Sequence, residues 1–295
     1  MPELPEVQAL VDSLRERTSG SRIVGVELAA LSALKTFDPP LDACVGATVV
    51  DVERRGKHIV IDTADAQGEE LALVIHLARA GWMSWRDGAA ARAKPGKGPL
   101  ALRVTFENDD AQLGVVDVTE AGTKKSLAIY ITRDVETIPR IERLGRDPVT
   151  DPMTPAELKA LLRDQGKRRL KTVLRDQSVL AGVGNAYSDE ILHVARLSPF
   201  AAADGLSDDQ LQALHAAITN VLQTAIERAH GVEWNLLKDG KRNAMAVHAR
   251  TGETCYVCGD TVREVSYASE SFQYCPTCQT NGNVLADRRL SRLLK

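Results

Sequence analysis

Apolar residues near the amino terminus recur at the spacing of a helix. Val7, Leu10 and Leu14 fall on one helical face, Pro5 suits a first turn and Gly20 is a plausible stop. The pattern therefore predicts a helix that begins almost at the chain terminus.

The following hundred residues have a different texture. From Arg22 to Thr132 short runs rich in Val and Ile alternate with polar positions, which is typical of strands. We expect a sandwich or barrel of roughly six to eight strands. A stretch from Arg86 to Pro99, with three consecutive alanines and Lys-Pro-Gly-Lys-Gly-Pro, predicts a loop.

Pro and Gly become frequent between Glu142 and Pro155, and the pattern beyond is helical. We place a domain boundary near residue 148. Helices are expected at about Pro155–Asp164, Arg168–Leu180, Asn185–Ala195 and Ser207–His230, the last with a capping-box pattern. The predicted fold is α+β, with an antiparallel β-sandwich domain and flanking helices at 1–148, a helical domain at 149–246, and a cysteine module with a basic tail at 247–295.

Composition favours a globular protein without a membrane segment. The chain has 295 residues, of which 44% are hydrophobic, and no apolar run approaches the ~20 residues that cross a bilayer. The first residues lack the layout of a signal peptide, so we expect a cytoplasmic protein.

The formal net charge of −3 argues at first against a nucleic-acid partner. Charge is distributed unevenly, however. The segment from Arg163 to Asp176 has six positive and two negative residues, and the last nine residues have four positive and one negative. These stretches could be solvated faces or contacts with phosphates.

Four of the five cysteines form two Cys-x-x-Cys pairs separated by sixteen residues. This spacing predicts a structural zinc ribbon, in which four thiolates surround one Zn²⁺ and leave no open position. Two disulfides or four unrelated thiols are the alternatives, and a cytoplasmic chain disfavours disulfides. The predicted ligands are Cys255, Cys258, Cys275 and Cys278, whereas isolated Cys44 reads as a core residue.

Pro2 follows the initiator Met, which is normally removed before proline. The exposed secondary amine, with a pKa of roughly 7.7 to 8.0, could attack C1′ of a deoxyribose and displace the base. Glu3 beside it could protonate the sugar. Alternatively, Glu3 and Glu6 simply complement the positive end of the first helix.

A second informative stretch is Leu174–Leu192, LRDQSVLAGVGNAYSDEIL. Gly182 and Gly184 permit a turn between two helices, and Asn185 opens the second one. The Asn185 amide and the free backbone N–H groups could hold a phosphate. Asn185 could equally be an ordinary helix cap.

These features occur together in a family-like order. The terminus PELPEV, the turn Arg55-Gly56-Lys57-His58, the boundary motif ERLGRDP, the stretch DQSVLAGVGNAYSDEIL and the zinc ribbon span essentially the whole chain. Together they resemble the formamidopyrimidine-DNA glycosylase and endonuclease VIII family. The resemblance implies a β-sandwich domain and a helix-two-turn-helix domain with a zinc finger, and DNA lying between the two domains.

The resemblance also implies residue roles. Pro2 would be the Schiff-base nucleophile, Glu3 the proton donor, Lys57 a phosphate-binding residue that assists elimination, and Asn185 a phosphate clamp. Lys171 and Asp176 fall in a segment similar to the family's DNA-facing stretch.

The chain departs from the members specialised for 8-oxoguanine at three places. His76-Leu77-Ala78 is followed by Arg79 instead of Met, and residues 120–125 replace the motif containing the wedge Phe and the base-reading Arg. Lys124 and Lys125 could substitute partly as DNA-binding residues. Glu270 stands where the family has a zinc-finger Arg, and a carboxylate would repel phosphate there, which puts δ-elimination in doubt.

The predicted function is a bifunctional DNA glycosylase and abasic-site lyase of base excision repair that acts on duplex DNA with a damaged base or abasic site. We expect a monomer associated with the nucleoid of a bacterial cytoplasm. One alternative is a non-catalytic or regulatory DNA-binding protein on the same scaffold. Another is a zinc-ribbon interaction protein that never binds DNA.

Overall fold

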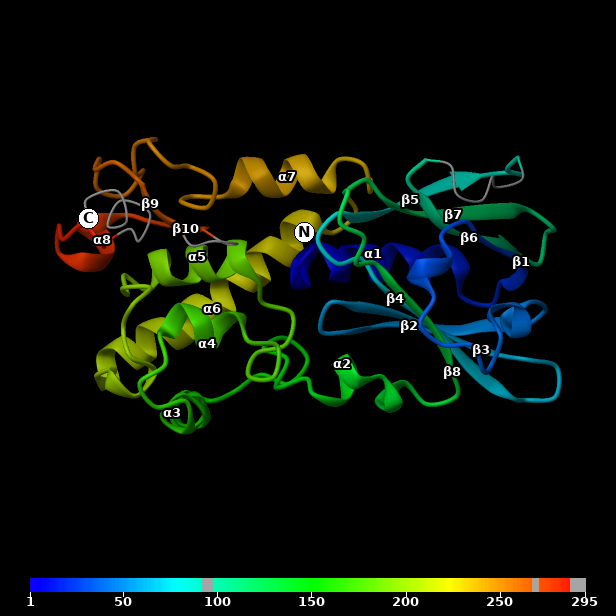
Figure 1. Cartoon of the computed structure of the whole chain (residues 1–295), viewed down its shortest axis with the longest axis horizontal. Coiled ribbons are helices and arrows are strands. Elements are labelled where there is room, and N and C mark those ends of the chain that lie inside the picture. The colour runs from blue at the N-terminus through cyan, green and yellow to red at the C-terminus, as the bar shows by residue number, and fades with distance from the viewer. Residues whose placement is uncertain (92–97, 267–270, 287–295) are drawn as a thin grey trace. The chain divides into compact units, whose positions relative to one another are not determined.

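Eight antiparallel strands form one hydrogen-bonded sheet in the computed structural model, which describes all residues except 92–97, 267–270 and 287–295 (Figure 1). The strand order is β5-β7-β6-β1-β2-β3-β4-β8. Strands β1 and β2 are paired only at Arg22 and Thr48, so the sheet divides there into two layers of four strands. The strands are β1 (Arg22–Leu28), β2 (Thr48–Arg55), β3 (His58–Ala64), β4 (Glu70–His76), β5 (Gly81–Asp87), β6 (Leu100–Glu107), β7 (Leu113–Glu120) and β8 (Ala128–Thr132).

Helix α1 (Leu4–Thr18) packs against β2 and β3. Its apolar face, including Leu10 and Leu14, is fully buried with Ile59 and Ile61 of β3 in one core cluster. Trp234 is also buried in this cluster, although it lies far along the chain. The core of the β-sandwich is therefore completed by a segment that follows the helical part of the sequence.

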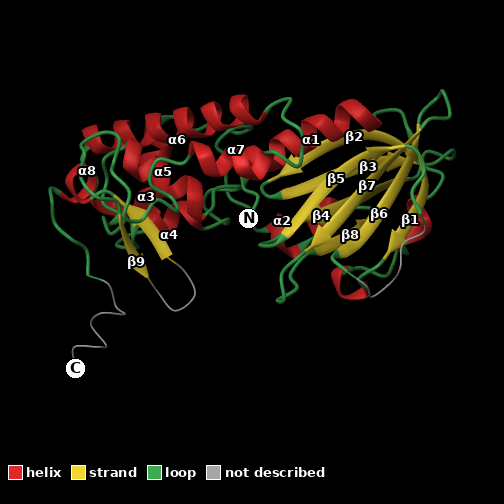
Figure 2. Ribbon diagram, turned by 90° about the horizontal axis from the view of Figure 1, so that it is seen from above, coloured by secondary structure: helices red, strands yellow, loops and turns green. Residues whose placement is uncertain are grey.

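The remaining helices are mostly in the carboxyl-terminal half (Figure 2). The zinc-ribbon region contributes a two-stranded hairpin, β9 (Arg263–Ser266) and β10 (Ser271–Tyr274). The helices are α2 (Pro139–Glu142), α3 (Pro155–Asp164), α4 (Leu170–Arg175), α5 (Asn185–Val194), α6 (Asp208–Ala229), α7 (Leu237–Ala244) and α8 (Pro276–Thr280).

The chain separates into two compact units. The sandwich unit contains Met1–Arg143 and Ala229–Lys238, and the helical unit contains Leu144–Arg228 and Asp239–Lys295. None of the helices in the described residues is both long and apolar enough to cross a membrane.

The α+β fold with its antiparallel sheet is as predicted, and α3 has the predicted bounds. The helix expected over Arg168–Leu180 is wrong in its second half, because α4 ends at Arg175. There Asp176 caps the following turn, with Ser178 donating to its carboxylate from both the backbone N–H (3.1 Å) and Oγ (2.6 Å). Local side-chain hydrogen bonds thus replace the next helical turn.

Candidate active site and metal centre

The amino-terminal candidates lie at the start of α1. Pro2 is buried, and Glu3 and Glu6 are only 2% and 3% exposed. Glu3 and Glu6 form a reciprocal capping box, in which the Glu3 backbone N–H donates to Glu6 Oε2 at 2.9 Å. Each carboxylate therefore accepts a backbone N–H, so the helix start fixes the side chain of Glu3, the residue that follows Pro2 in the chain.

Lys57 lies in the tight turn between β2 and β3. Gly56 has a φ of +58°, a conformation that side chains with a Cβ rarely adopt. Arg54 connects this turn to α1, because its Nε donates to Gln8 Oε1 at 2.8 Å and its Nη1 donates to the Gly56 carbonyl at 3.1 Å. Lys57 is 9% exposed. One arginine thus holds the Lys57 turn against the helix that starts at Pro2.

A pair of histidines follows the Lys57 turn and was not singled out from the sequence. The rings of His58 and His76 have centroids 4.6 Å apart, on paired positions of β3 and β4. His58 Nδ1 lies 3.1 Å from the Arg55 carbonyl, and its buried Nε2 has no hydrogen-bond partner among the described residues. Burial lowers the pKa of His58 to about 4. Burial, with His58 and Arg140 nearby, also lowers the pKa of His76.

The two departures in the sandwich unit lie in turns. Arg79 is exposed in the turn before β5, where Ala78 has a positive φ of 52°. The turn is tight, since a Cβ on Gly81 would lie 2.1 Å from the Leu77 carbonyl oxygen. The loop after β7 is closed by Glu120, whose Oε1 accepts from the backbone N–H of Ser126 (2.8 Å) and Leu127 (3.1 Å).

Both lysines of that loop are exposed. Lys125 donates to the Glu120 carbonyl, whereas no hydrogen bond is recorded for Lys124 within the described part of the chain. The loop therefore presents two ammonium groups without burying either.

Lys171 of α4 is buried, with a side chain 4% exposed. Its ammonium donates to Asp189 Oδ1 (2.6 Å), Ser188 Oγ (2.8 Å) and the Asn185 carbonyl (2.7 Å). Asp189 Oδ2 lies 2.7 Å from His248 Nδ1. Lys171 thus joins α4 to the first turns of α5, which brings together two of the residues predicted to bind DNA.

Asn185 is the first residue of α5, and Gly184 occupies the capping position. The ordinary cap considered for Asn185 is therefore not formed. Its Nδ2 donates to the Ser271 carbonyl of β10 at 2.8 Å, and its buried Oδ1 has no hydrogen-bond partner within the described ranges. Asp176, in contrast, accepts a hydrogen bond from Ser178 Oγ and binds Arg168 at 2.7 Å, and these two contacts lower the Asp176 pKa.

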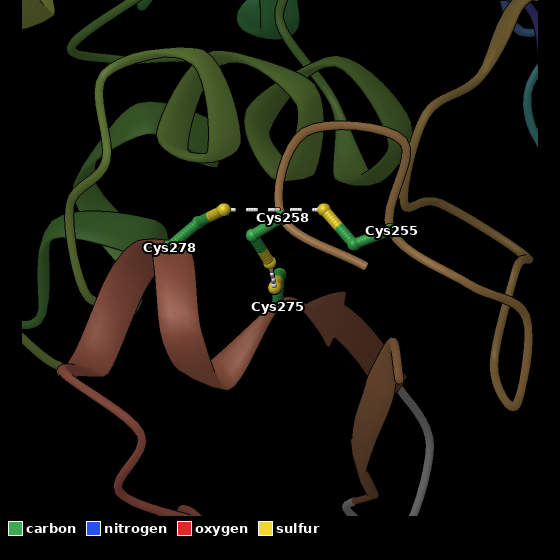
Figure 3. A group of neighbouring side chains, drawn as sticks. All are labelled: Cys255, Cys258, Cys275 and Cys278. Atoms are coloured by element: carbon green, nitrogen blue, oxygen red, sulfur yellow. Dashed lines mark hydrogen bonds between the residues drawn. The ribbon is translucent and has the colours of Figure 1, made fainter. Parts of the chain in front are cut away.

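The four cysteines of the ribbon converge on one point, as Figure 3 shows. All four sulfurs lie within 4.8 Å of one another, with 3.9 Å between Cys255 and Cys278 and 3.3 Å between Cys258 and Cys275. Four thiolates around one Zn²⁺ would be about 3.8 Å apart, so the residues fit a tetrahedral metal. Burial raises the pKa of Cys275 to about 11, and a bound cation would offset that cost of the thiolate.

Helix α5 also reaches the four-cysteine cluster. His193 Nε2 lies 3.3 Å from Cys255 Sγ, and the His193 ring packs edge-on against Tyr256. Glu190 accepts the backbone N–H groups of Ala246, Val247 and His248 at 2.8 to 3.0 Å. The sequence alone did not identify His193 or Glu190, because their partners lie about sixty residues away. Glu270 and the basic tail from residue 287 lie outside the described residues.

Comparison with protein families gives two matches. Residues 1–124 match the formamidopyrimidine-DNA glycosylase N-terminal domain, and residues 144–235 match the formamidopyrimidine-DNA glycosylase H2TH domain. A formamidopyrimidine-DNA glycosylase of Desulforamulus reducens is 32% identical over 95% of this chain and 99% of its own length. The chain belongs to the formamidopyrimidine-DNA glycosylase family.

Other relatives are similar in part or in full. A formamidopyrimidine-DNA glycosylase of Symbiobacterium thermophilum is 33% identical over 98% of this chain and 93% of its own. An uncharacterized formamidopyrimidine-DNA glycosylase-like protein of Mycobacterium tuberculosis is 64% identical, but only over 43% of this chain and 80% of its own.

The fold matches solved structures of the family. A Lactococcus lactis formamidopyrimidine-DNA glycosylase bound to DNA containing an abasic site superposes with a TM-score of 0.78 over 94% of this chain and 99% of that one, at 24% identity. The predicted family and fold are therefore confirmed.

Proposed function

We propose that the protein is a DNA glycosylase and abasic-site lyase of base excision repair, acting on double-stranded DNA that contains a damaged base or an abasic site. Membership of the glycosylase family supports this proposal at the level of the reaction. The observation that carries it to particular residues is the start of α1, where Glu3 is fixed beside Pro2 by the capping box with Glu6.

The chemistry would begin once Met1 is removed and Pro2 has a free secondary amine. The amine nitrogen attacks C1′ of the damaged nucleotide, the bond between C1′ and the base breaks, and the base leaves with a proton. Glu3 is the proposed proton donor to the deoxyribose as the ring opens. The product is a cationic Schiff base between Pro2 and the sugar.

Strand cleavage would follow from the same cation. The iminium acidifies the C2′ protons, a base removes one of them, and the C3′–O3′ bond breaks by β-elimination. The leaving group is the 5′-phosphate of the next nucleotide. Lys57, held near α1 through Arg54 and Gln8, is the proposed contact to phosphate during this step.

We assign the DNA contacts of the helical unit to Asn185 and to the region around Lys171 and Asp176, and those of the sandwich unit also to Lys124 and Lys125. The N1 position of Asn185 supports a role near a phosphate, because backbone N–H groups at a helix start favour anions. Lys171 would act by holding α5 in place, since its ammonium already binds three acceptors.

We infer that the four-cysteine cluster holds one structural Zn²⁺. Sulfur ligands and a closed tetrahedron favour zinc and leave no position for a substrate. The metal would supply a cation that ties Cys255 and Cys258 to Cys275 and Cys278. Metal analysis of the purified protein should give about one zinc per chain, and a Cys258→Ser variant should contain less.

Borohydride trapping on duplex DNA with an abasic site tests the reaction. The wild-type protein should form a covalent adduct with the DNA, because reduction fixes the Schiff base. Pro2→Gly and a chain with extra residues before Pro2 should lose it. Glu3→Gln should slow release of a damaged base, whereas the control Glu16→Gln, exposed on the same helix, should not.

An adduct that survives blocking of the Pro2 amine would contradict the assignment of the nucleophile. No adduct from wild type, with salt-dependent binding to duplex DNA intact, would favour the non-catalytic DNA-binding protein. Absence of any DNA binding would favour the remaining hypothesis, a zinc-ribbon interaction protein that never binds DNA.

A further inference from the structure

A buried turn connects α4 to α5 and leads directly into Asn185, the first residue of α5. It runs from Asp176 to Gly184, and residues 179–184 are all buried. Within it Gly182 has a φ of +86°. Water has little access to a buried turn, so other groups of the protein must bind its backbone N–H and carbonyl groups. The shape of this turn therefore depends on hydrogen-bond partners within the helical unit.

The Gln177 side chain supplies three of these hydrogen bonds. Its Nε2 donates to the Arg175 carbonyl at 2.9 Å and to the Val183 carbonyl at 2.7 Å, and its Oε1 accepts from the Gly182 N–H at 3.0 Å. This pattern fixes the orientation of the carboxamide, because a flipped group would turn its oxygen toward two carbonyls. Gln177 thus connects the last residue of α4 to the two residues that precede the Gly184 cap.

A second segment of the helical unit binds the same turn through its backbone. The Gly145 N–H donates to the Gln177 carbonyl at 2.8 Å, and the Ala181 N–H donates to the Arg146 carbonyl at 3.0 Å. A Cβ on Gly145 would lie 2.5 Å from two carbonyl oxygens of the turn, so glycine is needed for this close approach. Gly145 and Arg146 of the boundary motif ERLGRDP therefore hold the outside of the turn, and the Gln177 side chain holds its two ends together.

Helix α5 itself is held by other contacts. Lys171 of α4 donates to the Asn185 carbonyl at 2.7 Å and to Asp189 Oδ1 at 2.6 Å. These hydrogen bonds do not involve the Gln177 side chain, so they remain when that side chain is changed. Loss of the Gln177 carboxamide would therefore release the backbone just before Asn185 without releasing the helix.

We propose that Gln177 is a positioning residue for DNA binding, which sets the place of Asn185 relative to a DNA phosphate. The inference rests on the proposed function, in which Asn185 contacts a phosphate. Hydrogen bonds weaken steeply as their distance and angle depart from the optimum, so a small displacement of the helix start weakens this contact. Gln177 acts through the backbone of Gly182 and Val183 and does not itself contact the phosphate.

A double-mutant cycle between Gln177 and Asn185 tests the proposal. The probe is a duplex with one tetrahydrofuran analogue of an abasic site, and fluorescence anisotropy gives its Kd. Asn185→Ala and Gln177→Met should each weaken binding by about tenfold, the effect of one hydrogen bond to a charged group. Methionine matches glutamine in length but lacks its amide. The double variant should bind much more tightly than the loss of about a hundredfold that two independent effects would give.

Gln212→Met is the matched control, since it makes the same change at an exposed position of α6 in the same unit. It should keep the wild-type affinity and leave the effect of Asn185→Ala unchanged. Circular dichroism melts report the folding of each variant, and affinities are compared below the lowest melting temperature. Gln177→Asn replaces Gln177→Met where the latter does not fold. Its amide is one methylene too short to reach the Arg175 and Val183 carbonyls together, so the same coupling to Asn185 is expected.

Wild-type affinity in a folded Gln177 variant would overturn the proposal, because Gln177 would then stabilise the turn without affecting DNA binding. A double variant that shows the full product of the two single effects would also overturn it, since Gln177 would act independently of Asn185. Wild-type affinity in Asn185→Ala would remove the phosphate contact and the positioning role together.

Borohydride trapping on the same wild-type preparation separates these failures from that of the proposed function. An adduct from wild type, with no coupling between Gln177 and Asn185, removes the positioning role and leaves the lyase reaction. Absence of an adduct contradicts the lyase reaction itself.

Discussion

Two lysine–aspartate pairs of the helical unit differ sharply in their surroundings. In the Lys171–Asp189 pair the side chains are 4% and 0% exposed, and in the Lys159–Asp208 pair they are 37% and 81% exposed. Removal of one partner from a buried pair leaves an uncompensated charge, whereas exposed pairs contribute little.

Lys171→Met should therefore lower the free energy of unfolding by about 3 to 5 kcal/mol. Lys159→Met, the matched control, should change it by less than about 1 kcal/mol. Urea unfolding followed by circular dichroism gives both values. Similar losses from the two substitutions would show that water or another cation stabilises Asp189 in the absence of Lys171.

The His58 ring gives the sandwich unit a dependence on pH. Its pKa is lowered from about 6.5 to about 4 by burial, so the folded state binds its proton less tightly than the unfolded state. This contribution to stability is complete above pH 6.5 and is lost as the pH falls toward 4. Such a pKa shift corresponds to a contribution of about 3 kcal/mol at most to the free energy of unfolding.

We expect the unfolding midpoint of the sandwich unit to fall between pH 7 and pH 4 more steeply in wild type than in His58→Phe. Tryptophan fluorescence during urea titration measures it. His230→Gln, an exposed histidine of the same unit, should retain the wild-type slope. If the unfolding midpoints of wild type and His58→Phe fall in parallel with pH, the loss of stability at low pH comes from other groups.

For single residues, the sequence gives the chemical type of each side chain but does not predict which groups surround it in the folded protein. The run around Lys171 reads as a basic face, yet the Lys171 ammonium is buried against α5. Spacing could not reveal this, because Asp189 and His248 approach it only in the folded unit. For Glu3 and Glu6 the two interpretations coexist, since the capping box that stabilises the helix also holds Glu3 beside Pro2.

Among the elements, α5 contacts both the four-cysteine cluster and the segments next to it. Asn185 binds β10, Asp189 and Glu190 bind the segment at 246–248, and His193 lies against Cys255. Helix α5, which is ten residues long, thus positions the β9–β10 hairpin, the segment at 246–248 and the proposed zinc ligand Cys255. Groups that hydrogen-bond to ligands orient them and tune metal affinity.

His193→Phe should therefore weaken zinc binding by about 10- to 100-fold. Competition with a chromogenic chelator measures the affinity independently of DNA cleavage. Val194→Ala is the control, because Val194 is the next residue of α5 and is exposed. An unchanged affinity in His193→Phe would mean that the imidazole only fills space beside Tyr256.

Prediction of the elements succeeded where local signals were strong. The capping box of Thr154 and Glu157 defines the start of α3, which the sequence predicted correctly. Helix α7 was missed, because LKDGKRNA contains Gly240 and few apolar residues to mark a buried face. Local propensity is weak there, so tertiary contacts decide the structure.

For the whole molecule, the informative feature is the return of the chain to the sandwich unit at Ala229–Lys238. Trp234 is buried in the sandwich core, and the Trp82 Nε1–H donates to its carbonyl at 3.1 Å. Sequence periodicity cannot reveal that a residue after the helical segment completes an earlier core. As a result, all three tryptophans belong to the sandwich unit and all four clustered cysteines belong to the helical unit.

This distribution predicts two separable unfolding signals. Removal of the metal by a chelator should lower the midpoint of the circular dichroism transition, because the ribbon loses the ion that joins its cysteines. The tryptophan fluorescence transition should stay within about 1 °C, since Trp82, Trp85 and Trp234 report only the sandwich unit. In a Cys255→Ser and Cys278→Ser double variant, the chelator should change neither the midpoint of the circular dichroism transition nor that of the fluorescence transition.

Thermal melts with both probes on one sample make the comparison. If the two transitions shift together on chelation, the two units unfold as one cooperative body. If only circular dichroism shifts, the metal stabilises the helical unit alone. The sandwich unit would then keep Pro2, Glu3 and Lys57 in place without the metal. Removal of zinc would in that case reduce DNA cleavage by weakening the binding of DNA.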